Sequence, residues 1–281
     1  MFNVFLEKLI DAESTENNVE GNETALTMLT DFLTNMHFKV SVQGKDFTNQ
    51  PVIVAHRKGF KSDRKILIYG HYDVATVNKE RQWLSQNPFQ LELINGRYFG
   101  RGIADNKGPL SARLFAVKSL IDAHAPCPEI LWLIQGEEEV HRAEPVANSV
   151  FAKAIANFGC KVVVDETGFN DIDSDEQIAF LWSPGLHFDT LTNYQKLISA
   201  CLGEVRFECR HLNKLMGISS CPLLRNISHD TVYIGFGPND KLHNIHKNNE
   251  SLAVDKLSKH QQQFELFLTS YATSSLLENY S

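Results

Sequence analysis

The residues best suited to chemistry lie between positions 65 and 108, where an imidazole and two carboxylates follow an apolar run. His71 and Asp73 come just after residues 66–70, an apolar run that ends in glycine. Such a run is typical of a buried strand in a parallel sheet, and a spacing of two in extended backbone puts both side chains on one face. Asp73 could therefore hold one ring nitrogen of His71 while the other binds a metal. Asp105, in a glycine-punctuated turn, adds a further carboxylate, so the stretch indicates a zinc site.

Two later apolar runs also end at acidic residues. Residues 129–134 are followed by the glutamates at 137–139, and residues 160–164 are followed by Asp165. Ligands of open α/β sheets bind at the carboxyl ends of the strands, so these groups should meet at one edge. The pattern predicts an α/β fold with a mostly parallel central sheet and helices on both faces. Apolar periodicity places those helices near residues 2–10, 25–36, 109–123, 145–158 and 251–271.

The amino-acid sequences of these motifs resemble those of one enzyme family. The chain resembles co-catalytic zinc metallopeptidases in three motifs: GHYDV at 70–74, NGRYFGRG at 95–102 and ADNKGP at 104–109. Trp83 and Phe89, which lie between the first two motifs, also fit the pattern. That family includes carnosinases and other dipeptidases, glutamate carboxypeptidase, acetylornithine deacetylase and succinyl-diaminopimelate desuccinylase. HYDV and DNKGP resemble the dipeptidase branch most.

The resemblance implies two zinc ions per chain, for which Co²⁺ or Mn²⁺ could substitute. It implies that Asp105 bridges the ions, that the peptide bond after it is cis, and that Glu138 is the catalytic base with Asp73 supporting His71. The implied ligands are His71, Asp105 and Asp165 for one ion and Asp105, Glu139 and His246 for the other.

Two assignments stay open at this point. The acidic pair of the family could fall on Glu137 and Glu138 instead of Glu138 and Glu139, and His243 is a rival to His246 in the HKNNE context. Three further histidines, His124, His211 and His260, are expected at the surface.

The family's lid domain is missing from its expected place near residues 185–205, because the sheet needs most of the residues between Asp165 and Val232. We therefore expect a single catalytic domain over residues 1–281. In relatives the lid carries the dimer interface, a substrate-gripping arginine and a carbonyl-polarising histidine, so we also expect a monomer with an open site. Candidates for the substrate-binding, carbonyl-polarising group are His187, His229 and His243, while Glu137 or Glu166 could hold a free α-amine.

Composition argues against several other classes of function. The net charge of −7 without a basic stripe disfavours nucleic-acid binding. No apolar run approaches the length of a membrane span, residues 1–10 lack a signal-peptide core, and the five cysteines form no CxxC pair. We therefore expect a cytoplasmic protein with reduced thiols and no membrane partner.

The leading hypothesis is zinc-dependent hydrolysis of an amide bond in small peptides, of aminopeptidase or dipeptidase type. One alternative is a deacylase acting on N-acyl amino acids. Another, of a different class, is a catalytically silent homologue that binds metal or peptide.

Overall fold

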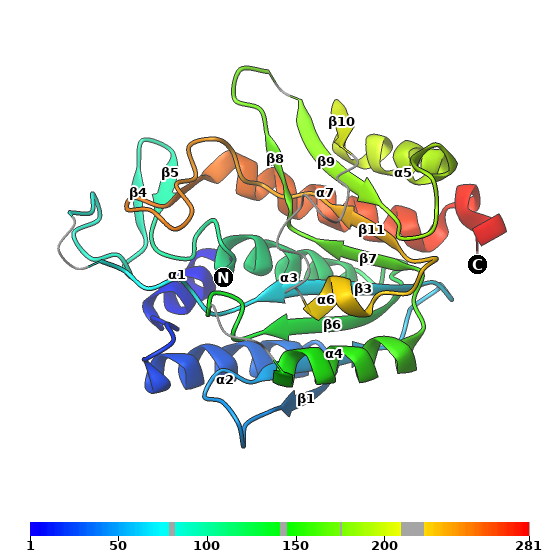
Figure 1. The fold of residues 1–281 in the computed structure, drawn as a ribbon. Coiled ribbons are helices and arrows are strands. Elements are labelled where there is room, and N and C mark those ends of the chain that lie inside the picture. The colour runs from blue at the N-terminus through cyan, green and yellow to red at the C-terminus, as the bar shows by residue number, and fades with distance from the viewer. Residues whose placement is uncertain (79–81, 141–144, 175, 209–221, 281) are drawn as a thin grey trace.

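The central sheet is built on four parallel strands whose side chains are buried on both faces. The computed structural model describes residues 1–281 except 79–81, 141–144, 175, 209–221 and 281 (Figure 1). Strands β3 (Lys65–His71), β6 (Glu129–Gln135), β7 (Val162–Asp165) and β11 (Val232–Gly235) lie in the order β6-β3-β7-β11. Runs of Val, Ile and Leu suit such strands, because helices cover both faces of a parallel sheet.

Antiparallel pairs extend this core on both sides, so the described sheet has nine strands. The flanking strands are β1 (Lys39–Gln43), β2 (Val52–Arg57), β8 (Gly168–Asn170), β9 (Gln177–Trp182) and β10 (Val205–Glu208). Strand β2 pairs antiparallel with β6, and β9 pairs antiparallel with β11. The predicted fold class, an α/β sheet with a parallel core, is confirmed.

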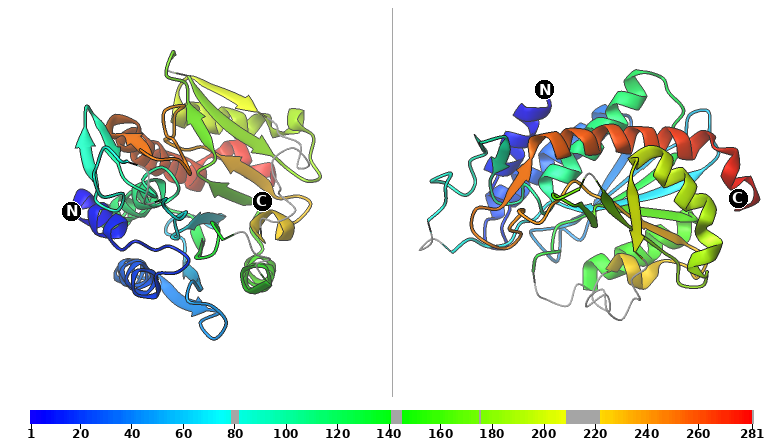
Figure 2. Two further views of the ribbon diagram at one scale, coloured as in Figure 1. Left: turned by 60° about the vertical axis from the view of Figure 1, so that its left-hand side comes forward. Right: turned by 90° about the horizontal axis from the view of Figure 1, so that it is seen from above.

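Helices cover both faces of the sheet (Figure 2). One face packs against α2 (Val19–Asn35), α3 (Lys107–Asp122), α5 (Thr192–Leu202) and α7 (Val254–Thr273), and the other against α4 (Pro145–Phe158) and α6 (Pro222–Asn226). Strand β7 shows the alternation directly, since Val162 and Val164 pack on the α3 and α7 face while Val163 packs on the α4 and α6 face.

The remaining elements are short or peripheral. They are α1 (Phe2–Asp11), the 3₁₀ turns η1 (Phe188–Leu191) and η3 (Ser275–Tyr280), and a small sheet of β4 (Glu92–Ile94), β5 (Arg97–Phe99) and β12 (Ser251–Ala253). The last predicted helix is shorter at its start than expected, because residues 251–253 pair with β5. Within the described residues, no helix is both long and apolar enough to cross a bilayer.

Candidate metal centre

His71 ends strand β3 and lies at the centre of the site. Its Nε2 atom is 2.9 Å from Asp105 Oδ1, and its Nδ1 atom is 3.3 Å from both Oδ1 and the carbonyl oxygen of Asp73. Asp73 is fully buried and its other carboxylate oxygen accepts a hydrogen bond from the Glu139 amide. The imidazole is therefore held from one side and presents Nε2 to the other ligands, as the spacing of two residues predicted.

Asp105 lies in a loop that a buried carboxylate holds in place. Glu250 accepts hydrogen bonds from the amides of Gly102, Ala104 and Asp105 at 2.9–3.1 Å and pairs with the Arg101 guanidinium at 2.6 Å. The peptide bond between Asp105 and Asn106 is cis, as the resemblance implied. The loop thus brings the Asp105 carboxylate to the carboxyl ends of β3 and β6.

Glu139 and His246 approach Asp105 from the loops after β6 and β11. His246 Nε2 is 2.8 Å from Glu139 Oε2 and 3.4 Å from Asp105 Oδ2. The Glu139 side chain is 5% exposed, and its second oxygen, Oε1, has no hydrogen-bond partner among the described residues. His243 is not part of this group of atoms, so the geometry favours His246 over its rival.

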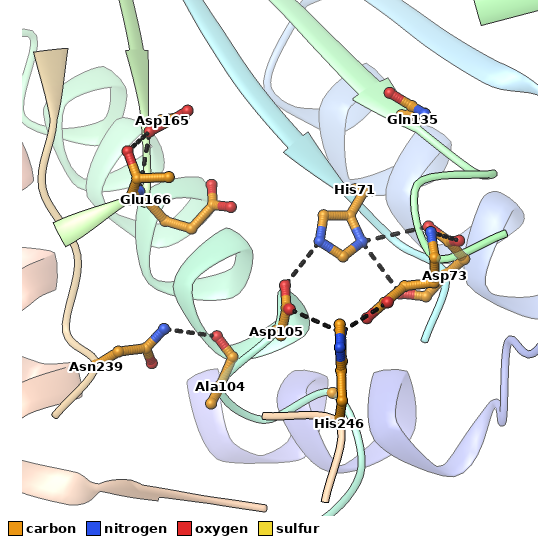
Figure 3. A network of polar contacts seen from close by, with 12 residues as sticks. His71, Asp73, Ala104, Asp105, Gln135, Asp165, Glu166, Asn239 and His246 are labelled. Carbon is orange, nitrogen blue, oxygen red and sulfur yellow. Dashed lines mark hydrogen bonds and ion pairs between the residues drawn. The ribbon is translucent and has the colours of Figure 1, made fainter. Parts of the chain in front are cut away.

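The expected ligand Asp165 is replaced in the structure by its neighbour Glu166. Ligand atoms of His71, Asp105 and Glu166 lie within 4.8 Å of one another, and Glu166 points into the site on the opposite side of Asp105 from His246 (Figure 3). The Asp165 carboxylate instead accepts hydrogen bonds from Thr167 and, at 2.5 Å, from the Tyr233 hydroxyl. The structure groups Glu166 and not Asp165 with these residues because side chains alternate along β7: Asp165 falls on the face of Val163 and Glu166 on the face of α3.

The described residues fit two metal ions. Asp105 belongs to both groups that could hold an ion, one with His71 and Glu166 and the other with Glu139 and His246. Imidazole and carboxylate ligands without thiolate are typical of catalytic zinc. The buried Glu139 Oε1 atom is an acceptor without a hydrogen-bond partner among the described residues, and a bound ion would satisfy it.

The carboxylates raise the pKa of both histidines in the metal-free site. Hydrogen bonds to Asp105 and Glu139 raise the pKa of His246 to about 10. Burial alone would lower the pKa of His71, but the charge of Glu138 and the hydrogen bonds to Asp105 and Asp73 outweigh it and raise the pKa well above 6.5. The ring of His246 is therefore protonated at neutral pH, and both rings hold their protons more tightly than a free imidazole.

Metal affinity should consequently rise with pH between 6 and 8. His246 must lose the proton that its pKa of about 10 holds, so the summed logarithm of the two association constants should rise by at least about one per pH unit, and His71 adds to this rise. Competition with a chromophoric chelator at pH 6, 7 and 8 measures this slope. His246→Asn should lower this slope by about one, whereas a substitution of the exposed His124 should leave it unchanged. A slope near zero would contradict the ligand roles of both histidines.

Glu138 has the properties of a proton acceptor beside this site. Protein atoms crowd its carboxyl, although the residue reaches solvent. This partial loss of hydration, with repulsion from Asp105 and Glu139, raises the pKa of Glu138 to about 7 against the attraction of His71. A pKa near the working pH is what a general base needs.

A cavity of about 440 Å³ adjoins the second group of ligands. Glu139, His246 and Glu16 line it, together with the apolar and hydroxyl side chains at 74–76 and Val140. Its volume falls in the usual range for small-ligand sites. Glu137 is not among the lining residues, and its carboxylate accepts a hydrogen bond from Thr48 at 2.5 Å.

Two of the three expected substrate-binding histidines lie at the wrong edge of the sheet. His187 follows the end of β9 and His229 precedes the start of β11. Since β9 runs antiparallel to β11, both lie at the amino-terminal edge of the parallel strands, away from His71. His243 lies at the correct edge, beyond the end of β11, and burial lowers its pKa despite the nearby charges of Asp240 and Asp105.

Sequence reasoning missed several residues that support the site. Glu250 was visible only as the last letter of HKNNE, yet it holds the Asp105 loop. Arg113 reads as an ordinary helix residue but is buried beneath Glu166. His260 was expected at the surface and is also buried, as the partner of Arg113, while His211 lies outside the described residues.

Comparison with known structures shows that the fold is shared with a solved enzyme structure. Human carnosine dipeptidase 1 superposes with a TM-score of 0.74 at 12% sequence identity, and the alignment covers 96% of each chain. At that identity the likeness establishes the fold. Together with the family signature given next, this fold places the chain in the metallopeptidase class.

The chain belongs to Peptidase family M20/M25/M40, whose sequence signature matches residues 67–270. Among curated proteins, it is 39% identical over 90 residues to the probable di- and tripeptidase DUG2 of Saccharomyces cerevisiae, which is 32% of this chain and 10% of that protein. It is 38% identical over 96 residues to N-formyl-4-amino-5-aminomethyl-2-methylpyrimidine deformylase of Halalkalibacterium halodurans, which is 33% of this chain and 22% of that protein. These matched stretches cover less than a quarter of either relative's length.

Proposed function

We propose that this chain hydrolyses amide bonds in small peptides, as an aminopeptidase or dipeptidase with two zinc ions. The observation that carries the proposal is the pair of ligand groups that share Asp105. Zinc bound there would act as a Lewis acid and would supply hydroxide at neutral pH. His71 and Glu166 would hold one ion, and Glu139 and His246 the other.

The side chains around the ions would then orient substrate and move the proton. Glu138 takes a proton from the attacking water and passes it to the leaving amine. Asp73 keeps His71 in one ring orientation through Nδ1. His243 is the remaining candidate for a hydrogen bond to the scissile carbonyl.

The acidic wall of the adjoining cavity supports substrates with a free α-amine. Glu16 lines this cavity beside Glu139. A protonated amine would be attracted to these carboxylates, whereas an acylated amine carries no charge for them to bind. The deformylase relative supports the alternative, a deacylase that acts on blocked amines.

We also propose that residues 184–208 belong to the catalytic domain and do not begin a lid. Helix α5 packs against α7, and β10 pairs in parallel with β9 of the main sheet. An experimental structure with these residues in a separate fold would contradict this assignment.

A matched pair of substrates tests the activity. Zinc-loaded protein should cleave dipeptides and aminoacyl amides at least about tenfold faster than the same compounds with an acetylated amine, because only the free amine carries charge. Chelated protein and Glu138→Gln serve as controls for contaminating peptidases. Faster cleavage of the acetylated series would establish the deacylase, and no zinc-dependent cleavage of either would support the silent homologue.

A further inference from the structure

A buried arginine lies directly behind one of the two ligand groups. Arg113 projects from α3 and is 1% exposed. Its Nη2 atom donates to the carbonyl oxygens of Asp165 at 2.5 Å and Phe236 at 2.8 Å, and its Nε atom donates to His260 at 3.2 Å. The guanidinium carbon also lies 4.7 Å from the ring centre of Phe264. The group is thus fixed in an apolar layer beneath the site.

The third nitrogen of this guanidinium faces Glu166. Arg113 Nη1 is 4.0 Å from Glu166 Oε2 and has no hydrogen-bond partner among the described residues. The carboxylates whose charge acts on Arg113 are those of Glu166 and Asp165. His246 lies on the other side of Asp105 (Figure 3), and Glu139 Oε2 is 2.8 Å from its Nε2 atom.

We propose that Arg113 makes the two metal positions unequal, so that the ion held by His71, Asp105 and Glu166 binds more weakly and leaves first. A fixed positive charge behind a ligand carboxylate repels a dication in front of it, and burial limits the screening of that repulsion. The inference rests on the proposed two-ion site and adds an order of loading to it. Arg113 acts here through Glu166, as a positioning and charge-setting residue.

Charge and geometry can be separated with two substitutions. Arg113→Gln removes the charge. Arg113→Lys keeps the charge but lacks the planar guanidinium, which donates to the carbonyl oxygens of Asp165 and Phe236. Arg64→Gln is a matched control, because Arg64 also donates to two backbone carbonyls, those of Ser274 and Leu277, at the far end of β3. Titration with Co²⁺ against a chromophoric chelator, followed by the visible absorption of the bound ion, reports both binding steps without activity.

We expect two steps in the unsubstituted protein, with dissociation constants at least about tenfold apart. Arg113→Gln should tighten the weaker step by about tenfold, while Arg113→Lys and Arg64→Gln should leave it within about threefold. Glu166→Gln should remove the weaker step and Glu139→Gln the tighter one. The two glutamate variants keep Arg113, so they test the order of loading even if Arg113→Gln fails to fold.

The outcomes distinguish this inference from the function on which it rests. A purely structural Arg113 predicts weaker binding in both arginine variants, and that result would overturn the inference while leaving two zinc ions in place. Loss of the tighter step in Glu166→Gln would also overturn it. A single ion in every protein, even in excess metal, would overturn the two-ion proposal itself.

Discussion

Replacing Asp105 with asparagine should remove both metal ions and lower turnover by about 10⁴-fold or more. Asp105 is the one ligand shared by both groups of the described site, and a neutral amide cannot balance two dications as a carboxylate does. Loss of the ions removes both the Lewis acid and the source of hydroxide. Elemental analysis after zinc loading, paired with steady-state kinetics, measures the two effects.

Asp122→Asn is the matched control for this substitution. Asp122 lies at the other end of α3 and pairs with Lys118 on the surface, so its replacement should leave metal content and turnover unchanged. Circular dichroism should show both variants folded. An Asp105→Asn protein that retains two zinc ions would contradict the bridging role.

Glu138→Gln should keep both ions and lower turnover by about 10²–10⁴-fold, the usual contribution of a positioned base. Glutamine has nearly the same shape but cannot accept the proton that the raised pKa of Glu138 suits it to take. The neighbouring substitution Glu139→Gln should instead lose one ion, because Glu139 contacts His246. Metal content and turnover of the two variants, measured side by side, separate base from ligand.

This pair also tests the assignment of the three consecutive glutamates. If Glu138→Gln loses zinc while Glu139→Gln keeps it, the base and ligand lie one residue earlier. In that case Glu137→Gln should keep both ions and lose turnover. Glu23→Gln is the control for loss of one negative charge, because Glu23 is exposed and its substitution should change neither metal content nor turnover.

The sequence predicted those parts of the site that depend on short spacing. His71 and Asp73 share a face because they are two residues apart, and the carboxyl ends of the parallel strands β3 and β6 do meet. These features follow from local backbone geometry and from the rule for parallel sheets. The family signature then supplied the roles of Asp105 and His246.

The errors arose where the answer depended on which face or edge of the sheet a residue occupies. Asp165 and Glu166 are adjacent carboxylates at a strand end, and alternation says only that they point to opposite faces. The face toward the site is decided by the packing of α3, whose Arg113 meets Glu166. Similarly, His187 and His229 are misplaced because the antiparallel direction of β9 depends on its pairing with β11, which local sequence does not reveal.

The hydrogen bonds by which Glu250 holds the Asp105 loop have a consequence for how the protein is synthesised. The amides that Glu250 holds are 145 to 148 positions earlier in the chain. Most of the carboxylates of the site therefore leave the ribosome well before the residue that fixes their central loop, and closing so long a loop is entropically costly. A nascent chain that ends before Glu250 holds a cluster of acidic groups without the acceptor that orders Asp105. Completion of the metal centre is thus tied to the arrival of the last small strand, β12, and the helix that follows it.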